Sequence, residues 1–222
     1  MSVPLHLPLQ AVQSGSYYSG GGPIRTPPPD LPSLLLQERI VYLGLPLAQE
    51  AEANVTKLIV AQLLYLQYED RSKPIFMYIN STGTYNYDTA AFAIADTMNY
   101  IAPPVHTICL GNAIGMAAML LAAGEKGHRA SLPHATITLH QPFGGAEGQA
   151  SDIQIRTKEL LTIKRMMVDQ LHNTTGQEKE RISRDTERFY YLTPEEAKEY
   201  GIIDQVLASR QDLPVPAVGA AV

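Results

Sequence analysis

The side chains of this sequence best suited to proton transfer or metal binding are its six histidines. They do not fall at metal-ligand spacings, so we expect no metal site. One of them, His140, lies in a Leu-His-Gln-Pro segment. It is either a general base or a histidine whose strand packs and whose imidazole hydrogen-bonds locally. The remaining five are His6, His106, His128, His134 and His172.

Neither the glycines nor the single cysteine indicates a cofactor. Gly111 and Gly115 are not followed by the Lys-Ser or Lys-Thr pair of a phosphate-binding loop, so we expect no bound nucleotide. Cys109 lies in an apolar run, which is typical of a buried structural thiol. One cysteine cannot form an internal disulfide, which permits a reducing compartment.

Length and composition describe one globular domain with tails. The chain has 222 residues, of which 45% are hydrophobic, and a formal net charge of −5 without a basic stripe. Nucleic acid is therefore excluded as the main partner, because phosphate binding needs concentrated Lys and Arg. The apolar run 116–123 is too short to cross a bilayer. The N-terminus lacks the pattern of a secretory signal or a transit peptide.

Helical and strand patterns alternate between two Pro- or Gly-rich ends. We predict a flexible extension over 1–32, one domain over 33–209 and a flexible tail over 210–222. Strands separated by helices favour an α/β fold with a mainly parallel sheet. The predicted helices are 48–70, 89–101, 115–123 and 152–173, and a capping box at Thr193 starts one more. The predicted strands are 74–80, 105–110 and 136–139.

The segment 109–124, CLGNAIGMAAMLLAAG, closely resembles the start of the active-site helix in the Clp protease proteolytic subunit family, ClpP or peptidase S14. Further motifs follow in that family's order: LLQERIVYLG (35–44), YINS (78–81), LHQP (139–142), GGAEGQASD (144–152), DTER (185–188) and EEAKEYGIID (195–204). The resemblance covers roughly residues 31–209. It implies a ClpP- and crotonase-like spiral with a protruding strand–helix handle at about 144–173.

The resemblance also shows what is missing. The family's serine position is Gly115, its histidine is His140, and its acid falls at Phe189. A serine protease needs a hydroxyl, a base and an acid that orients the base. The similarity is therefore greatest to ClpR, the non-catalytic branch of the family, and we expect no enzyme activity. Asp185 or Glu187 would replace the acid only if the alignment slipped.

The oxyanion turn is altered as well. The family reads Asn-Ser-Pro-Gly-Gly, whereas this chain reads Asn-Ser-Thr-Gly-Thr over 80–84, with about two residues inserted before residue 89. The second glycine is replaced by Thr84, next to Gly83, and threonine does not easily adopt a positive φ. We expect the hole to be distorted. Ser131 and Ser151 do not lie at the turn that opens the 115–123 helix, so neither is a replacement nucleophile.

Two surfaces implied by the family remain. One is a ring interface formed by the handle, although burial inside the same domain would give the same helical spacing. The other is an aromatic pocket that receives a loop of an ATP-driven unfoldase, although ordinary packing also explains these aromatics. The residues are Leu160, Ile163, Met167 and Arg188 for the ring, and Phe76, Tyr78 and Tyr100 for docking.

We therefore expect an inactive ClpP-like subunit that needs no cofactor. It would share a mixed heptameric ring with an active ClpP paralogue, in a stacked double ring, and an Hsp100-type unfoldase would supply unfolded proteins. The expected location is the cytosol, cyanobacterial rather than plastid. Two alternatives are an active serine endopeptidase with a substituted nucleophile and a crotonase-like acyl-CoA enzyme, for which Asp88 is the one carboxylate near the turn.

Overall fold

A computed structural model describes residues 30–47, 54–84, 88–209 and 212. The predicted extensions 1–32 and 210–222 lie almost wholly outside these ranges, as does the inserted part of the altered turn at 85–87. The first helix begins at Leu31, two residues before the predicted domain start. The predicted domain boundaries otherwise stay predictions.

The described chain forms helices and strands in the following order: α1 (Leu31–Gln37), β1 (Ile40–Leu43), α2 (Asn54–Glu69), β2 (Ile75–Ser81), α3 (Thr89–Tyr100), β3 (Val105–Ile114), α4 (Met116–Ala122), β4 (Arg129–Ser131), β5 (Thr136–Leu139), α5 (Ala150–Thr175), α6 (Lys179–Asp185), β6 (Tyr190–Leu192), α7 (Pro194–Tyr200) and β7 (Gln205–Val206). Apart from the strand expected at 144–152, the elements predicted from the sequence are present close to their expected bounds, and the described part of the helix predicted over 48–70 begins at Asn54.

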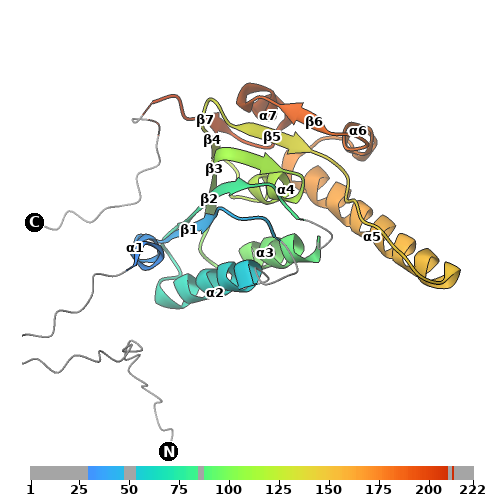
Figure 1. The fold of residues 1–222 in the computed structure, drawn as a ribbon. Coiled ribbons are helices and arrows are strands. Elements are labelled where there is room, and N and C mark those ends of the chain that lie inside the picture. Colours follow the sequence, from blue (N-terminus) through green and yellow to red (C-terminus); the bar gives the residue numbers. More distant parts are fainter. Residues whose placement is uncertain (1–29, 48–53, 85–87, 210–211, 213–222) are drawn as a thin grey trace, which may run out of the picture.

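One sheet organises the fold (Figure 1). Its strands run in the order β1-β2-β3-β4-β7, while β5 branches from the far end of β3 and carries β6 on its other side. All pairs are parallel except β5 with β6. The prediction of an α/β fold with a mainly parallel sheet is confirmed.

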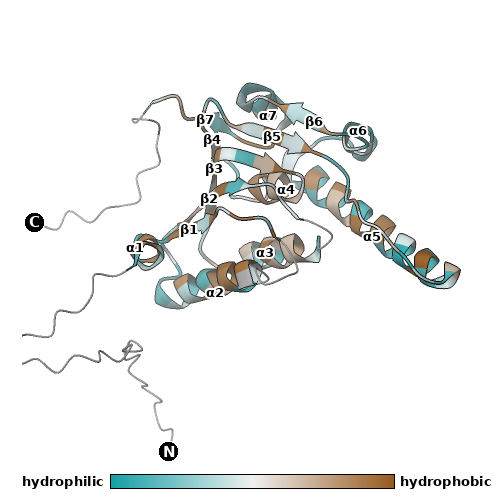
Figure 2. Ribbon diagram, viewed as in Figure 1, coloured by the Kyte–Doolittle hydropathy of each residue, from teal (hydrophilic) through white to brown (hydrophobic). Residues whose placement is uncertain are grey.

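The main core lies where α2, α3 and α4 cover one face of the sheet. All seven residues of α4 are buried, which explains why it reads as an almost continuous apolar run; it is brown in Figure 2. The opposite face carries a smaller apolar cluster of Phe76, Ile108, Ala130 and Leu207. The sheet is therefore apolar on both faces, as expected for parallel strands.

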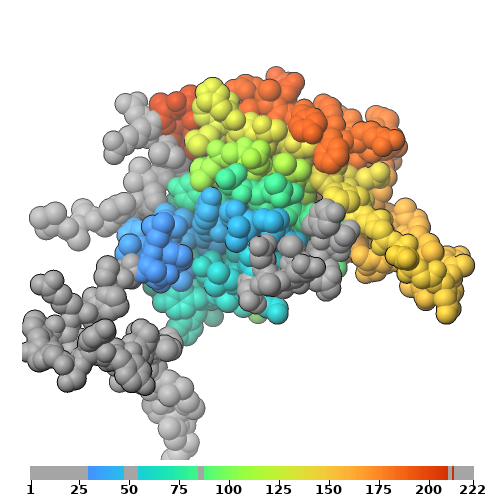
Figure 3. Space-filling view, in the orientation of Figure 1, coloured from blue at the N-terminus to red at the C-terminus, as the bar shows by residue number. Residues whose placement is uncertain are grey.

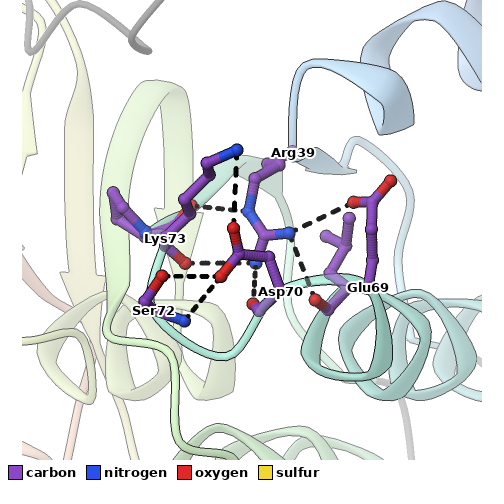
Figure 4. Close-up of polar contacts among 7 residues, drawn as sticks. Arg39, Glu69, Asp70, Ser72 and Lys73 are labelled. Carbon is purple, nitrogen blue, oxygen red and sulfur yellow. Dashed lines mark hydrogen bonds and ion pairs between the residues drawn. The ribbon is translucent and has the colours of Figure 1, made fainter.

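A buried arginine fastens the end of α2 to the first strand (Figure 4). Arg39 donates hydrogen bonds to the carbonyl oxygens of Leu66, Asp70, Lys73 and Pro74, and to the Glu69 carboxylate. Leu66 lies in the last turn of α2 and the other three carbonyls lie in the chain that follows, so the cation ties this segment together and complements the negative end of the helix dipole.

The capping box predicted at Thr193 is present, with reciprocal hydrogen bonds to Glu196, and Gly201 ends α7 in the left-handed conformation. The strand expected over 144–152 is absent. A strand requires a hydrogen-bonded neighbour, and this segment has none within the described part of the single chain. It runs as irregular chain to the start of α5.

Helix α5 is the most prominent feature of the shape. Its 26 residues extend over about 39 Å, and its first half projects from the body of the molecule (Figures 1 and 3). The first buried residue of α5 is Ile163; residues 150–162 contain none. The protruding part of the handle is therefore the outer half of α5 and the chain that leads to it.

Candidate functional site

Gly115 occupies the single-residue turn between β3 and α4. Its φ of 56° and ψ of −112° lie outside the range that side chains readily adopt, and its N–H donates to the Thr138 carbonyl oxygen at 2.7 Å. A sharp, strained turn from strand to helix is where a nucleophilic serine sits in other hydrolases. Here the geometry of such a turn is kept and the hydroxyl is absent.

The imidazole of His140 lies directly over this turn. A Cβ atom built on Gly115 would be 2.3 Å from His140 Nε2, so the ring occupies space that any side chain at 115 would need. Nδ1 lies 2.8 Å from the Gln141 carbonyl oxygen. A carbonyl oxygen only accepts hydrogen bonds, so Nδ1 carries a proton, and the neutral tautomer that this bond selects has Nε2 as its acceptor.

Phe189, the predicted acid position, lies beside the imidazole. Its ring centroid is 4.9 Å from that of His140, and it is an aromatic contact rather than a hydrogen-bond acceptor. The two carboxylates left open as replacements point elsewhere: Asp185 accepts from the Tyr200 hydroxyl and faces Arg181, and Glu187 is exposed. The structure thus brings Gly115, His140 and Phe189 together without a nucleophile or an acid.

The described part of the altered oxyanion turn, up to Thr84, is held by its own hydrogen bonds. Gly83 takes the positive φ of 82°, and its N–H donates to the Ser81 hydroxyl. Among the described residues the one non-glycine with positive φ is Arg39, so Thr84 keeps an ordinary backbone shape. Its hydroxyl hydrogen-bonds to Asp88. The N–H of Gly83 is therefore engaged inside the turn rather than free to hold an oxyanion.

These residues enclose a pocket of about 500 Å³. Its walls combine the turn, the end of β3 and the aromatic rings around His140; they are Pro46, Thr82, Gly83, Thr84, Ile114, His140, Phe143 and Phe189. No charged side chain of the described chain lines it. The pocket is therefore shaped for an uncharged, mostly apolar occupant.

Sequence reasoning missed two contributors to this site. The ring centroid of Phe143 is 5.6 Å from that of His140. Phe143 directly follows the Leu-His-Gln-Pro segment, and this position in the sequence could have indicated that it belongs to the site. The carbonyl of Gln141 gave no signal, because every residue has one and only the fold shows where it points.

Two of the four residues predicted for the ring interface are buried in the subunit, and two are at least partly accessible. Met167 is 1% exposed inside the main core and Ile163 is also buried, so neither offers free surface to another subunit. Their assignment to a ring contact is corrected: the helical spacing reflects packing against their own domain. Leu160 is half-buried on the projecting part, and Arg188 is exposed beside Phe189.

The residues predicted for docking also differ from one another. Phe76 is buried and packs edge-on against His106, at 5.1 Å between centroids. Tyr78 lies half-buried against the same small cluster, and its burial raises the pKa of the phenol. Tyr100 is 79% exposed at the end of α3. Ordinary packing therefore explains Phe76, while the two tyrosines present surface.

Cys109 is buried, and burial raises the pKa of its thiol to about 11, as expected of a structural cysteine. Within the ranges that the structure describes, no group of three or more His, Cys, Asp or Glu side chains could hold a metal ion. No helix in those ranges has the length and apolarity to span a membrane.

Known proteins are similar in sequence to this chain over most of its length. Residues 29–210 match the Clp protease family. A Synechococcus elongatus protein described as "ATP-dependent Clp protease proteolytic subunit-like" is 58% identical, over 94% of this chain and 96% of that protein. The "ATP-dependent Clp protease proteolytic subunit 2" of Gloeobacter violaceus is 54% identical, over 92% and 93%.

A plant protein is also similar. The "ATP-dependent Clp protease proteolytic subunit-related protein 4, chloroplastic" of Arabidopsis thaliana is 50% identical, over 86% of this chain and 63% of that protein. The match over residues 29–210, together with these identities, shows that the chain belongs to the Clp protease family.

Proposed function

We propose that this chain is a catalytically inactive subunit of an ATP-dependent Clp protease. It assembles with active ClpP subunits into a mixed heptameric ring and a stacked double ring, in the cytosol. The observation that carries this proposal is the pairing of Gly115 with His140: a base lies over a strained turn from which the nucleophilic hydroxyl is missing.

The projecting half of α5 supports assembly. Ile153, Ile155 and Leu161 are exposed there, and no described part of the same chain covers them. Exposed apolar side chains gathered on one projecting element are typical of an interaction surface. We therefore move the proposed ring contact from the two buried residues to these exposed ones, and keep Leu160 and Arg188 in it.

An Hsp100-type unfoldase is the proposed source of unfolded substrates. The half-buried Tyr78 and the exposed Tyr100 are the aromatic side chains that such a partner could bury. Aromatic residues that combine apolar area with a polar end are frequent at interfaces. The unfoldase would supply the ATP-driven step, and this subunit itself would need no cofactor.

Three measurements on two preparations test this function. The purified chain, free of other Clp subunits, should not hydrolyse peptides, and a serine-reactive fluorophosphonate should leave it unlabelled. Native mass spectrometry of the complex from its own cells should show it in one ring with an active paralogue. Labelling of this chain would support a serine protease with another nucleophile, acyl-CoA binding would support a crotonase-like enzyme, and either result would overturn the proposal.

A further inference from the structure

The pocket beside Gly115 has one side-chain acceptor whose environment is unusual. His140 uses its Nδ1–H for the Gln141 carbonyl, which leaves the lone pair of Nε2 available. In the described ranges the buried side-chain polar atoms without a hydrogen bond are His106 Nδ1 and Thr138 Oγ1. Nε2 is therefore not sealed in the core, and His140 is part of the pocket wall.

The rest of the wall is suited to an aromatic ring. Phe189 and Phe143 flank His140, and Pro46 and Ile114 add aliphatic surface. The hydroxyl of Thr84 is already bonded to Asp88. Because no described charged side chain lines the pocket, a charged ligand would lose its hydration without a partner, which is costly.

The aromatic surface continues outside the pocket. Phe189 is 58% exposed and stacks with Tyr191, which is 65% exposed, at 6.2 Å between centroids. Neither ring belongs to the core of the subunit. Such a shelf at the mouth of an apolar pocket adds stacking surface for a second ring or for an extended chain.

We propose that this pocket binds, without cutting it, a neutral aromatic group that carries a hydrogen-bond donor, namely the phenol of a tyrosine or the indole of a tryptophan in an unfolded polypeptide. The ring packs between Phe143 and Phe189, and its O–H or N–H donates to His140 Nε2. That a polypeptide presents the group rests on the proposed function; the chemistry of the group does not.

The binding test uses the isolated full-length chain and two probes that differ only by one phenolic hydroxyl, p-cresol and toluene. We expect p-cresol to bind about fivefold more tightly than toluene, because one hydrogen bond between neutral groups contributes a factor of about that size to the affinity. His140→Phe keeps an aromatic ring and removes the acceptor, so it should abolish this difference. Phe189→Ala should weaken both probes alike.

Equal affinity of the two probes, a difference that survives in His140→Phe, or no binding of either probe would overturn the proposal. The ring ¹⁵N signal of His140 in the unmodified protein gives a readout that does not depend on a variant folding. It should shift with p-cresol and not with toluene, and the reverse or no shift also counts against the hydrogen bond.

A second arm identifies the source of the group. A blocked peptide with one tyrosine among glycines should bind more tightly than p-cresol, because the chain adds contacts along the Tyr191 shelf. Weaker peptide binding would overturn the polypeptide assignment in favour of a free small molecule. Neither arm needs a ring or an unfoldase, so its failure is distinguishable from failure of the proposed function.

Discussion

Restoring a serine at position 115 should disturb the fold and should not restore an enzyme. The backbone there has a φ of 56° and a ψ of −112°, and the new Cβ would lie 2.3 Å from His140 Nε2. Gly115→Ser therefore introduces backbone strain and displaces the imidazole. Gly115→Ala is the matched control, because it brings the same Cβ without the hydroxyl.

The size of the structural cost follows from the backbone. A residue held in such a sparsely populated region costs about 1–3 kcal/mol. For a chain of this length, each kcal/mol of lost stability lowers the melting temperature by roughly 2–4 °C. The melting temperature should therefore fall by about 2–12 °C. Both variants should show similar shifts, since the strain comes from the shared Cβ.

The catalytic deficit is larger than the structural one. Loss of the acid from other triads lowers turnover by about 10⁴-fold, and loss of an oxyanion donor by about 10²–10³-fold. The Gln141 carbonyl holds the correct tautomer of His140 but carries no charge to stabilise an imidazolium. These factors do not add in detail, because members of a triad act as a unit. Peptidase activity of Gly115→Ser should therefore be near background.

The assay places Gly115→Ser in mixed rings whose other subunits carry inactivated serines, so that any cleavage comes from this chain. Measurable activity is expected only after Phe189→Asp and a turn rebuilt as Pro-Gly-Gly are added. Activity near that of an ordinary active subunit from Gly115→Ser alone would refute this reasoning. It would mean that the ring of His140 moves freely and that Phe189 is not at the acid position.

Three further outcomes follow from the structure. Ile155→Asp combined with Leu161→Asp should reduce co-assembly in native mass spectra while the melting temperature of the isolated chain stays unchanged; undiminished assembly contradicts the ring contact. Tyr78→Ser with Tyr100→Ser should weaken unfoldase binding to mixed rings by about 1–3 kcal/mol per buried ring, measured by titration. Burial, and to a smaller extent the charge of His128, lowers the pKa of His106 from 6.5 to about 4. As the pH falls, His106 is therefore protonated in the unfolded chain before it is protonated in the folded chain. Stability should decline by about 2–3 kcal/mol between pH 6.5 and 4, and His106→Phe should remove that part of the decline in urea titrations.

The sequence was most informative where a local rule decides the structure. The capping box at Thr193 and the strand 136–139 were predicted from a few neighbouring residues, and both are present. Helix α6, Lys179–Asp185, was not predicted because it is short and mostly polar, and only Ile182 is buried. Its position depends on packing that a short window of sequence does not contain.

Contacts between distant segments were the harder part. Helical spacing could not decide whether Met167 faces its own core or another subunit, because both require the same apolar stripe; burial in the folded chain decides it. The segment 144–152, expected to be a strand, has no hydrogen-bonded neighbour in the described part of the chain, which local sequence could not reveal. The hydrogen bond that orients His140 comes from a backbone carbonyl, which has no signature among the amino-acid types.

The projecting half of α5 should make the resistance of the subunit to proteolysis depend on its assembly. Residues 150–162 have no buried side chain to hold them in place, and helices of about this length are marginal in water by themselves. Their amide protons should therefore exchange rapidly in the free subunit, and slowly in the proposed double ring, where a second ring would cover them. If the proposed assembly holds, an unassembled copy offers a segment that proteases can cut and an assembled copy does not, so surplus subunits would be removed preferentially.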